Sequence, residues 1–387
     1  MTLRTATNSG TRTGGKAGTP AGSPLGPRLP RPLARLGSAV GSSPLPRHLT
    51  LASVGLVVVI LVLESTGPFR NAQFASMAYL AIAAGGLTVL TGLNGQLSLG
   101  HGAFMAIGAY TTALCYQSEV PALPMVAVLF AAGAVTLVIG AVVGVAAARL
   151  HGPYIAGATL ALAVAIPGIP LYFSDVLGGE QGLNVRVPDI PGWFADVVYF
   201  VTANEITQSR YLAYIGWASL IVAFVLLANL SRSRVGRTWR AVRDDEVAAE
   251  IAGINLGRAR VLAFVVSAAC AGLAGSLMAL SVRITAPSGF TLTLSLLLLS
   301  AVVLGGLGSL FGALLGAALL TFLPQVVTGL GQDAGLSDLQ AAELAPLAYG
   351  LTTMLVILLA PAGIAGSIRA AWHRRKLKRQ HIGGNRT

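Results

Sequence analysis

Ten long runs of apolar residues constrain the fold of this chain more than any other feature of its sequence. Most of them approach the roughly 20 residues that an α-helix needs to cross a lipid bilayer. The runs lie at 49–63, 74–93, 102–117, 123–147, 154–172, 211–230, 261–282, 289–305, 311–328 and 345–361. Because lipid offers no partner for backbone polar groups, each run is expected to be helical. The sequence therefore predicts an all-α, polytopic integral membrane helical bundle of about ten transmembrane helices, or eight if one pair of short runs only dips into the bilayer.

The scarcity of charge supports a membrane protein and excludes a soluble one. Charged residues make up 10% of the 387 residues, against about 25% in a soluble domain, and a soluble fold needs more charge to cover its surface. Apolar residues make up 54%, which is too much for a chain that is disordered throughout. The two cysteines, Cys115 and Cys270, are far apart and are expected to pack as small apolar side chains.

Much of the net charge of +12 lies at the two ends of the chain. Residues 1–48 hold seven basic residues and no acidic one, and so do residues 369–387. Basic residues beside apolar runs mark the cytoplasmic side of a membrane and contact anionic headgroups, so the expected partner is the lipid bilayer and not nucleic acid. We predict a disordered basic cytoplasmic tail at 1–48, a transmembrane domain at 49–361 and a second basic cytoplasmic tail at 362–387.

Two polar loops with opposite charge give the expected orientation. Loop 172–210 carries five acidic and two basic residues, whereas loop 231–260 carries seven arginines and four acidic residues. The positive-inside rule places loop 231–260 in the cytoplasm and loop 172–210 outside. With an even number of spans, both termini are then cytoplasmic. The expected location is the inner or plasma membrane of the cell, as a multi-pass protein.

Small residues recur at four-residue spacing in several apolar runs. Such stripes let helix backbones approach closely in a membrane, where no hydrophobic force drives helices together. We interpret them as general helix packing rather than as a solute path. Two of the stripes are Gly308, Gly312 and Gly316, and Ala268, Gly272 and Ser276.

The stretch 90–102 differs from the other junctions because it is polar and rich in glycine. It contains Asn94, Gln96, Ser98 and His101 between two apolar runs. Backbone that breaks a helix at membrane depth is tolerated only where it is buried in protein or lines a cavity. The sequence leaves two interpretations open, a cytoplasmic turn or a broken helix beside a translocation pathway formed by these four side chains.

The chain lacks the residue patterns of catalysis, metal binding and ion coupling. None of its histidines pairs at metal-ligand spacing, and no serine lies in a nucleophile-elbow pattern. Ion-coupled carriers usually keep charged groups inside their spans, but here the charges fall at the edges of the runs. We therefore expect no enzyme activity, no metal and no cofactor bound by this chain. If it moves a solute, the energy is expected to come from another protein.

Loop 231–260 contains a predicted short helix. Asp244 is a suitable N-cap, acidic residues follow in the first turn, and Gly253 is a suitable stop, which gives a helix over Asp245–Ala252. Two turns are not stable alone in water, so this helix needs a surface on which to pack. It carries an acidic edge of Glu246 and Glu250 and a small apolar face of Val247, Ala248, Ile251 and Ala252. It is either a docking site for a partner or a linker that lies on the membrane surface.

At this loop the sequence resembles a known family, the permeases of ABC importers and in particular those for branched-chain amino acids. The residues that carry the resemblance are Asp245–Asn255, followed by the Ala- and Gly-rich run Phe264–Ala279. Further blocks that resemble this family are Gly95–Phe104, Gly108–Tyr110, Gly152–Tyr154 with Ala158–Ala161, Leu177–Leu183 and Val303–Gly312. The blocks at 152–154 and 177–183 are similar to the LivM-type subunit rather than to its LivH-type partner. Glu246 and Gly253 are seven residues apart, one more than in the general pattern, which leaves open which acid matches the family's glutamate.

The resemblance implies an ABC importer permease architecture and a transport subunit. Its expected partners are two cytoplasmic ATP-binding subunits, which hold the ATP and Mg²⁺, a related LivH-type permease, and an external solute-binding protein. The residues implied in coupling to the ATPase are Asp245, Glu246, Ala248, Ala249, Glu250 and Gly253. The expected solutes are branched-chain amino acids. The alternatives are a urea or short-amide permease of the same family, an ion-coupled secondary carrier and, least favoured, a membrane enzyme or anchor.

Overall fold

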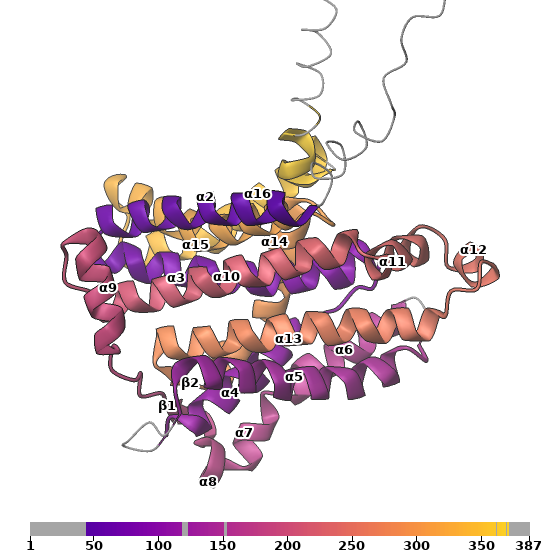
Figure 1. Ribbon diagram of the computed structural model, residues 1–387, viewed down its shortest axis with the longest axis horizontal. Helices are drawn as coiled ribbons and strands as arrows, with labels where there is room; N and C mark the ends of the chain where they lie inside the picture. The colour runs from indigo at the N-terminus through magenta and orange to yellow at the C-terminus, as the bar shows by residue number, and fades with distance from the viewer. Residues whose placement is uncertain (1–43, 118–122, 151–152, 361, 369, 371–387) are drawn as a thin grey trace, which may run out of the picture. The chain divides into compact units, whose positions relative to one another are not determined.

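The computed structural model describes residues 44–117, 123–150, 153–360, 362–368 and 370, and the two predicted tails lie largely outside them. Within the described residues the regular elements are helices, apart from the strands β1 (Leu183–Asn184) and β2 (Ile284–Thr285), an antiparallel pair that sets Leu183 opposite Thr285 (Figure 1). The predicted all-α class is confirmed. The first described helix begins at Pro44, inside the segment predicted as a tail.

The described chain forms the following helices in order. They are α2 (Pro44–Ser65), α3 (Pro68–Leu87), the π-helix η1 (Thr88–Leu93), α4 (His101–Cys115), α5 (Met125–Ala147), α6 (Pro153–Ala165), α7 (Gly168–Tyr172), α8 (Ser174–Leu177), η2 (Gly179–Gln181), α9 (Gly192–Thr202), α10 (Gln208–Arg232), α11 (Arg234–Asp244), α12 (Glu246–Ile251), α13 (Leu256–Val282), η3 (Pro287–Phe290), α14 (Leu292–Gly305), α15 (Leu310–Asp333) and α16 (Asp338–Leu359). Each of the ten predicted apolar runs falls on one or two of these elements.

Eight helical segments of the described chain are long and apolar enough to cross a membrane. This number lies within the predicted range of eight to ten, and the remaining two predicted runs coincide with α2 and the 15-residue helix α4. The eight segments are Pro68–Leu93, Met125–Ala147, Tyr154–Tyr172, Gln208–Arg232, Leu256–Val282, Pro287–Gly305, Leu310–Asp333 and Asp338–Ile368. The protein is thus a multi-pass membrane protein.

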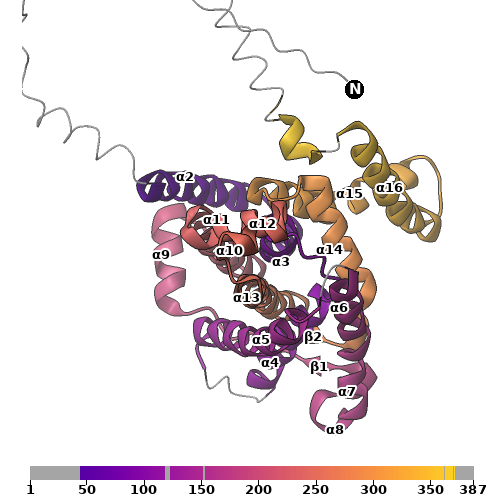
Figure 2. The ribbon, with the colours of Figure 1, turned by 90° about the vertical axis from the view of Figure 1, so that its right-hand side faces the viewer.

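Contacts between distant segments define two ends of the bundle. At one end, Arg243 bonds Gly92 at the end of η1, and Arg260 bonds Leu150 just after α5. At the other end, Glu64 at the end of α2 pairs with Arg210 at the start of α10. The ends of α3 with η1 and of α5 and the start of α13 thus lie at the first end, whereas the end of α2 and the start of α10 lie at the second. Helices α11 and α12 lie at the first end and α9 at the second (Figure 1), and Figure 2 looks onto the first end. We call it the arginine-rich end.

The tightest packing joins α13 to α4 and α5 through small residues. A Cβ added to Gly272 would collide with Thr136 of α5, and one added to Gly108 of α4 would collide with the backbone of Gly272. The next turn of α13 contacts α4 through Ser276, whose hydroxyl shares a short hydrogen bond with that of Thr112. Backbones approach this closely only where side chains are absent or small.

The second stripe of small residues is divided between a helix contact and a turn. Gly312 and Gly316 of α15 lie directly against the backbones of Gly305 and Ala301 in α14. Gly308 precedes α15, so it is not part of the helical stripe that the sequence suggested. It has a φ of +77° and faces the backbone of Gly92 across the turn. Glycine suits this position because other residues rarely adopt a positive φ.

Candidate functional site

Helix α11 fixes the position of the polar loop at the arginine-rich end. It begins where Ser233 caps its first turn, with the side chain accepting a hydrogen bond from the backbone N–H of Gly236. Trp239 is fully buried, and its Nε1 donates to the carbonyl of Ala259 on α13 at 2.9 Å. A buried tryptophan with a satisfied N–H anchors a helix through both its area and its hydrogen bond. Helix α11 is therefore held firmly against α13.

Helix α12 follows at once and is capped at both ends. Asp245 is its N-cap, with Oδ1 accepting from the backbone N–H of Ala248 at 3.0 Å. The sequence prediction of Asp244 is wrong by one residue, because Asp244 still belongs to α11. At the other end Gly253 has a φ of +84° and its N–H donates to Glu250, while that of Ile254 donates to Ala249. These two bonds form a Schellman motif.

The two faces of α12 differ in exposure. Ala249 is buried against the loop, whereas Val247 is 68% exposed and Ile251 is 84% exposed. Ala248 and Ala252 are exposed beside them. The predicted apolar face therefore exists and is uncovered in this chain. We call it the α12 face.

The two glutamates of α12 have different surroundings. Glu246 Oε2 accepts a hydrogen bond from Arg260 at 2.7 Å, and the Arg260 side chain is 2% exposed. Arg260 also donates to the carbonyl of Leu150 at 3.3 Å. Glu250 is exposed, and its side chain makes no hydrogen bond or ion pair with other described residues. Glu246 thus ties α12 to α13 inside the chain, and only Glu250 remains as the free acidic edge that the sequence suggested.

Residues 94–100 between η1 and α4 are not helical, and we call them, together with His101 at the start of α4, the break segment. Most of it is buried, and it and the adjoining Gly102 are tied to three helices. Leu99 N–H donates to Thr159 of α6 at 3.0 Å, and Gly102 N–H donates to Ser295 of α14 at 2.9 Å. His101 Nε2 lies 2.9 Å from the carbonyl of Ala83 in α3. Of the two open interpretations, these contacts favour a broken helix inside the bundle over a turn in solvent.

The break segment gathers buried polar atoms without protein partners. Asn94, Gln96 and Ser98 are each at most 5% exposed, and none of their side-chain polar atoms bonds another described residue. His101 Nδ1 is also buried and bonds no other described residue. Buried polar groups are normally paired with protein or water, so a cluster of unpaired groups indicates a place for water or a polar solute. The predicted pathway residues therefore lie along one short segment.

Arg243 joins the break segment to α11. Its Nη1 donates to the carbonyl of Gly92 at 2.9 Å, and Gly95 lies against its aliphatic stem. Gly95 has a φ of +80°, and a Cβ there would come within 2.9 Å of Arg243 Cγ. The arginine also bonds Asp244 at 2.7 Å. A continuous chain of contacts thus runs from α12 through α11 to the break.

Sequence reasoning missed α11 and the roles of Arg243 and Arg260. A signal for α11 was present, since Ser233 precedes apolar residues at Val235, Trp239 and Val242 with helical spacing. The arginines gave no local signal, because Arg243 bonds a residue 151 positions away.

Comparison with known proteins gives the family. Residues 72–360 match the family described as "Branched-chain amino acid transport system / permease component". The LivM permease protein of the high-affinity branched-chain amino acid transport system of Salmonella typhimurium is 33% identical over 282 residues, which are 68% of this chain and 66% of that protein. LivM of Escherichia coli gives the same values. BraD of Pseudomonas aeruginosa is 27% identical over 291 residues, 74% of this chain and 91% of that protein.

The chain thus spans slightly less than two thirds of the LivM relatives that it matches. LivH of Escherichia coli is 27% identical over 294 residues, 74% of this chain and 91% of that protein, which agrees with the predicted resemblance to the LivM type. No solved structure matches the chain. The matched residues run from α3 to α16 and include α11, α12 and the break segment. The chain belongs to the family of permease components of branched-chain amino acid transport systems.

Proposed function

We propose that this chain is the membrane-spanning permease subunit of an ATP-driven importer and that it translocates branched-chain amino acids. The names of the LivM and BraD relatives support this solute class. In the proposed complex an external binding protein delivers the solute, and a related LivH-type permease completes the membrane part. ATP and Mg²⁺ bind to two cytoplasmic subunits, and this chain binds neither. The arginine-rich end then faces the cytoplasm, as the excess of arginine suggests.

The α12 face is the observation that carries the proposal. A two-turn helix is unstable alone in water, yet here it is capped at both ends and tied to α13 by Arg260. With α12 held in this way, the side chains of Val247 and Ile251 remain 68% and 84% exposed. A rigid helix with an uncovered apolar face is suited to insertion into a groove of another protein. The groove proposed here belongs to an ATP-binding subunit.

The contacts behind α12 suggest how closure of that subunit would move the bundle. A push on α12 passes to α13 through Glu246 and Arg260, and to α11 through the shared junction at Asp245. Arg243 then carries the motion of α11 to Gly92, at the end of the broken helix. Rigid-body displacement of packed elements is a common way to transmit such changes. The unpaired polar groups of the break segment are proposed to face the solute or its water.

The test is the loss of the ATP-binding subunits when the α12 face becomes charged. The variant Ile251→Asp places a carboxylate at the centre of the proposed contact and should abolish copurification of those subunits with the full-length chain. ATP-dependent leucine uptake by cells should fall to background. The matched control is Arg258→Gln, which makes the same change in net charge at an exposed residue of the same end.

Normal copurification of the ATP-binding subunits with Ile251→Asp would overturn the proposed docking. Uptake that follows the proton gradient and ignores ATP would instead indicate an ion-coupled carrier. Competition of leucine uptake by urea or short amides would indicate the other solute class of the family. Each result is read against the Arg258→Gln control in the same cells.

A further inference from the structure

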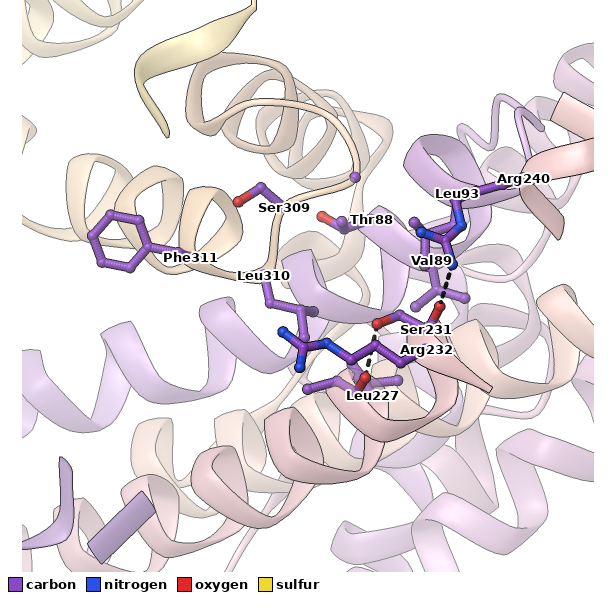
Figure 3. Close-up of a pocket in the computed structure, with 12 residues that line it drawn as sticks. Thr88, Val89, Leu93, Leu227, Ser231, Arg232, Arg240, Ser309, Leu310 and Phe311 are labelled. Carbon is purple, nitrogen blue, oxygen red and sulfur yellow. Dashed lines mark hydrogen bonds between the residues drawn. The ribbon is translucent and has the colours of Figure 1, made fainter. Parts of the chain in front are cut away.

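A pocket of about 380 Å³ lies at the arginine-rich end, beside the junction of α3 and η1 (Figure 3). Its wall is formed by η1, the end of α10, α11, the turn that leads into α15 and the first residues of α15. The pocket is large enough for the polar part of a small ligand. Its lining includes Thr88, Leu227, Arg232, Arg240, Leu310 and Phe311.

The polar side of the pocket is suited to an anion. Its lining includes two arginines and no acidic residue. Arg240 donates to the carbonyl of Ser231 at 2.9 Å and to that of Gly236 at 3.2 Å, which leaves other guanidinium N–H groups free. The guanidinium of Arg232 makes no hydrogen bond or ion pair with other described residues. Guanidinium groups bind phosphate with charge-assisted hydrogen bonds.

A buried hydroxyl gives an independent indication of a ligand. Thr88 is 1% exposed, lines the pocket, and its Oγ1 has no partner among the described residues. This is unusual for a helical threonine, whose hydroxyl normally bonds a backbone carbonyl of the preceding turn, as Thr112 also does with Gly108. A hydroxyl without such a bond is available to an oxygen of a bound group.

The remaining lining is apolar and points to the source of the anion. Leu227, Leu310 and Phe311 border the same pocket, and Phe311 is 54% exposed. Arg232 is the last residue of the apolar helix α10, which is long enough to span the membrane. A free inorganic anion gains nothing from contact with apolar side chains. A phospholipid, in contrast, carries acyl chains close to its phosphate, and these can pack on apolar side chains. Basic pockets between spans at the membrane surface are known to bind anionic headgroups.

We propose that this pocket binds the phosphate group of an anionic membrane phospholipid, held by Arg232, Arg240 and the hydroxyl of Thr88. The acyl chains then lie along Phe311 and the neighbouring apolar side chains. The lipid then touches η1, the end of α10, α11 and the start of α15 at once. It therefore stabilises the junction between the arginine-rich end and the broken helix. This inference requires only that the chain lies in a membrane and does not depend on the transported solute.

The test measures lipid binding to the full-length protein after removal of native lipid in detergent. Native mass spectrometry would follow the titration of phosphatidylglycerol, phosphatidylcholine and inorganic phosphate in separate samples. We expect one tightly held phosphatidylglycerol and much weaker binding of the other two. Removal of one arginine should weaken the binding about fivefold, and the double variant Arg232→Gln/Arg240→Gln about 25-fold.

The control is Arg234→Gln, which removes the same charge from an exposed residue of α11 outside the pocket and should leave the affinity unchanged. Thr88→Val keeps the shape of the side chain. It should weaken the binding of phosphatidylglycerol by less than the loss of one arginine does. Arg232→Gln by itself tests the site without removing a hydrogen bond or ion pair, because the Arg232 guanidinium makes none with the described residues. Equal binding of the two lipids, unchanged affinity in the double variant, or displacement of the lipid by micromolar phosphate would each overturn the proposal.

Discussion

Helix α12 and the break segment depart from ordinary residue placement in opposite directions. Helix α12 exposes Ile251 and Val247, whereas the break segment buries Asn94 and Ser98 with no hydrogen-bond partner for their side chains among the described residues. An apolar face left in water indicates a missing protein surface, since covering it is favourable. Buried polar atoms without partners indicate something small and polar, since leaving them unpaired costs free energy. The comparison agrees with the proposed function, in which α12 meets a protein outside the bundle and the break segment meets a solute or water inside it.

Arg243 is the residue that joins these two regions, and its loss should have the largest effect on transport. Arg243→Ala removes the bond to Gly92 and leaves the α12 face intact. We expect ATP-dependent uptake to fall at least tenfold while the ATP-binding subunits still copurify, a combination that separates transmission from docking. Arg234→Ala on the same helix should behave as the wild type. Loss of copurification in Arg243→Ala would show that the two regions are not distinct.

Separate substitutions of Glu246 and Glu250 test which of these two glutamates stabilises α12. Glu246→Ala leaves the Arg260 guanidinium buried at 2% exposure with only the Leu150 carbonyl as a partner. Removal of one partner of a buried ion pair costs about 3 kcal/mol, reduced here because Glu246 itself is half exposed. Thermal unfolding in detergent, with hydrogen exchange of α11 and α12, would measure the loss.

Glu250→Ala is the matched control for this pair, because the same side chain is removed from an exposed position of the same helix. We expect it to change the free energy of unfolding by less than about 0.5 kcal/mol. Equal destabilisation by the two substitutions would mean that the contact between Arg260 and Glu246 does not hold α12 in place.

Gly95 offers a smaller test on the side of the break. Gly95→Ala places an alanine at a φ of +80° and a Cβ within 2.9 Å of Arg243 Cγ. Gly335→Ala has a φ of +86° with no atom within 4 Å, so it carries the backbone strain alone. We expect the strain to cost about 1 kcal/mol at both sites and the crowding to add about 1 kcal/mol at Gly95. Equal losses of thermal stability in Gly95→Ala and Gly335→Ala would show that the Arg243 side chain moves aside at no cost in free energy.

Local features of the sequence predicted α12 well, and long-range contacts account for what was missed. Capping residues, charges and apolar spacing within ten residues predicted that a helix forms here, which face of it is apolar and that it ends at Gly253. The N-cap was misplaced by one residue because Asp244 and Asp245 are both good caps, and the unpredicted helix α11 uses the first of them. The pairing of Glu246 with Arg260 depends on how α13 folds back, which no local pattern specifies.

The break segment was predicted only in part for a related reason. Glycine and polar residues between two apolar runs indicated an interruption, but the same composition is typical of a turn in solvent. The partners that place it inside the bundle include Thr159 and Ser295, which bond Leu99 and Gly102 and are far away in sequence. The stripes of small residues were easier to predict, because tight packing needs only the absence of side chains. Gly308 was the exception, since its role depends on a positive φ in a turn.

The smallest expected effect on stability concerns Ser98, and it tests the polar half of the comparison most directly. Ser98→Ala removes a fully buried hydroxyl that has no partner among the described residues, so the free energy of unfolding should change by less than about 0.5 kcal/mol. Thr112→Val removes a hydroxyl that bonds Ser276 and Gly108, and should cost about 1–3 kcal/mol. Uptake should respond in the reverse order. A hydroxyl kept unpaired for a passing solute raises the KM for leucine when lost, whereas a packing hydroxyl does not. If Ser98→Ala changes neither the stability nor the uptake kinetics, Ser98 is not part of the pathway. The polar side chains that this segment contributes to the pathway would then be Asn94, Gln96 and His101.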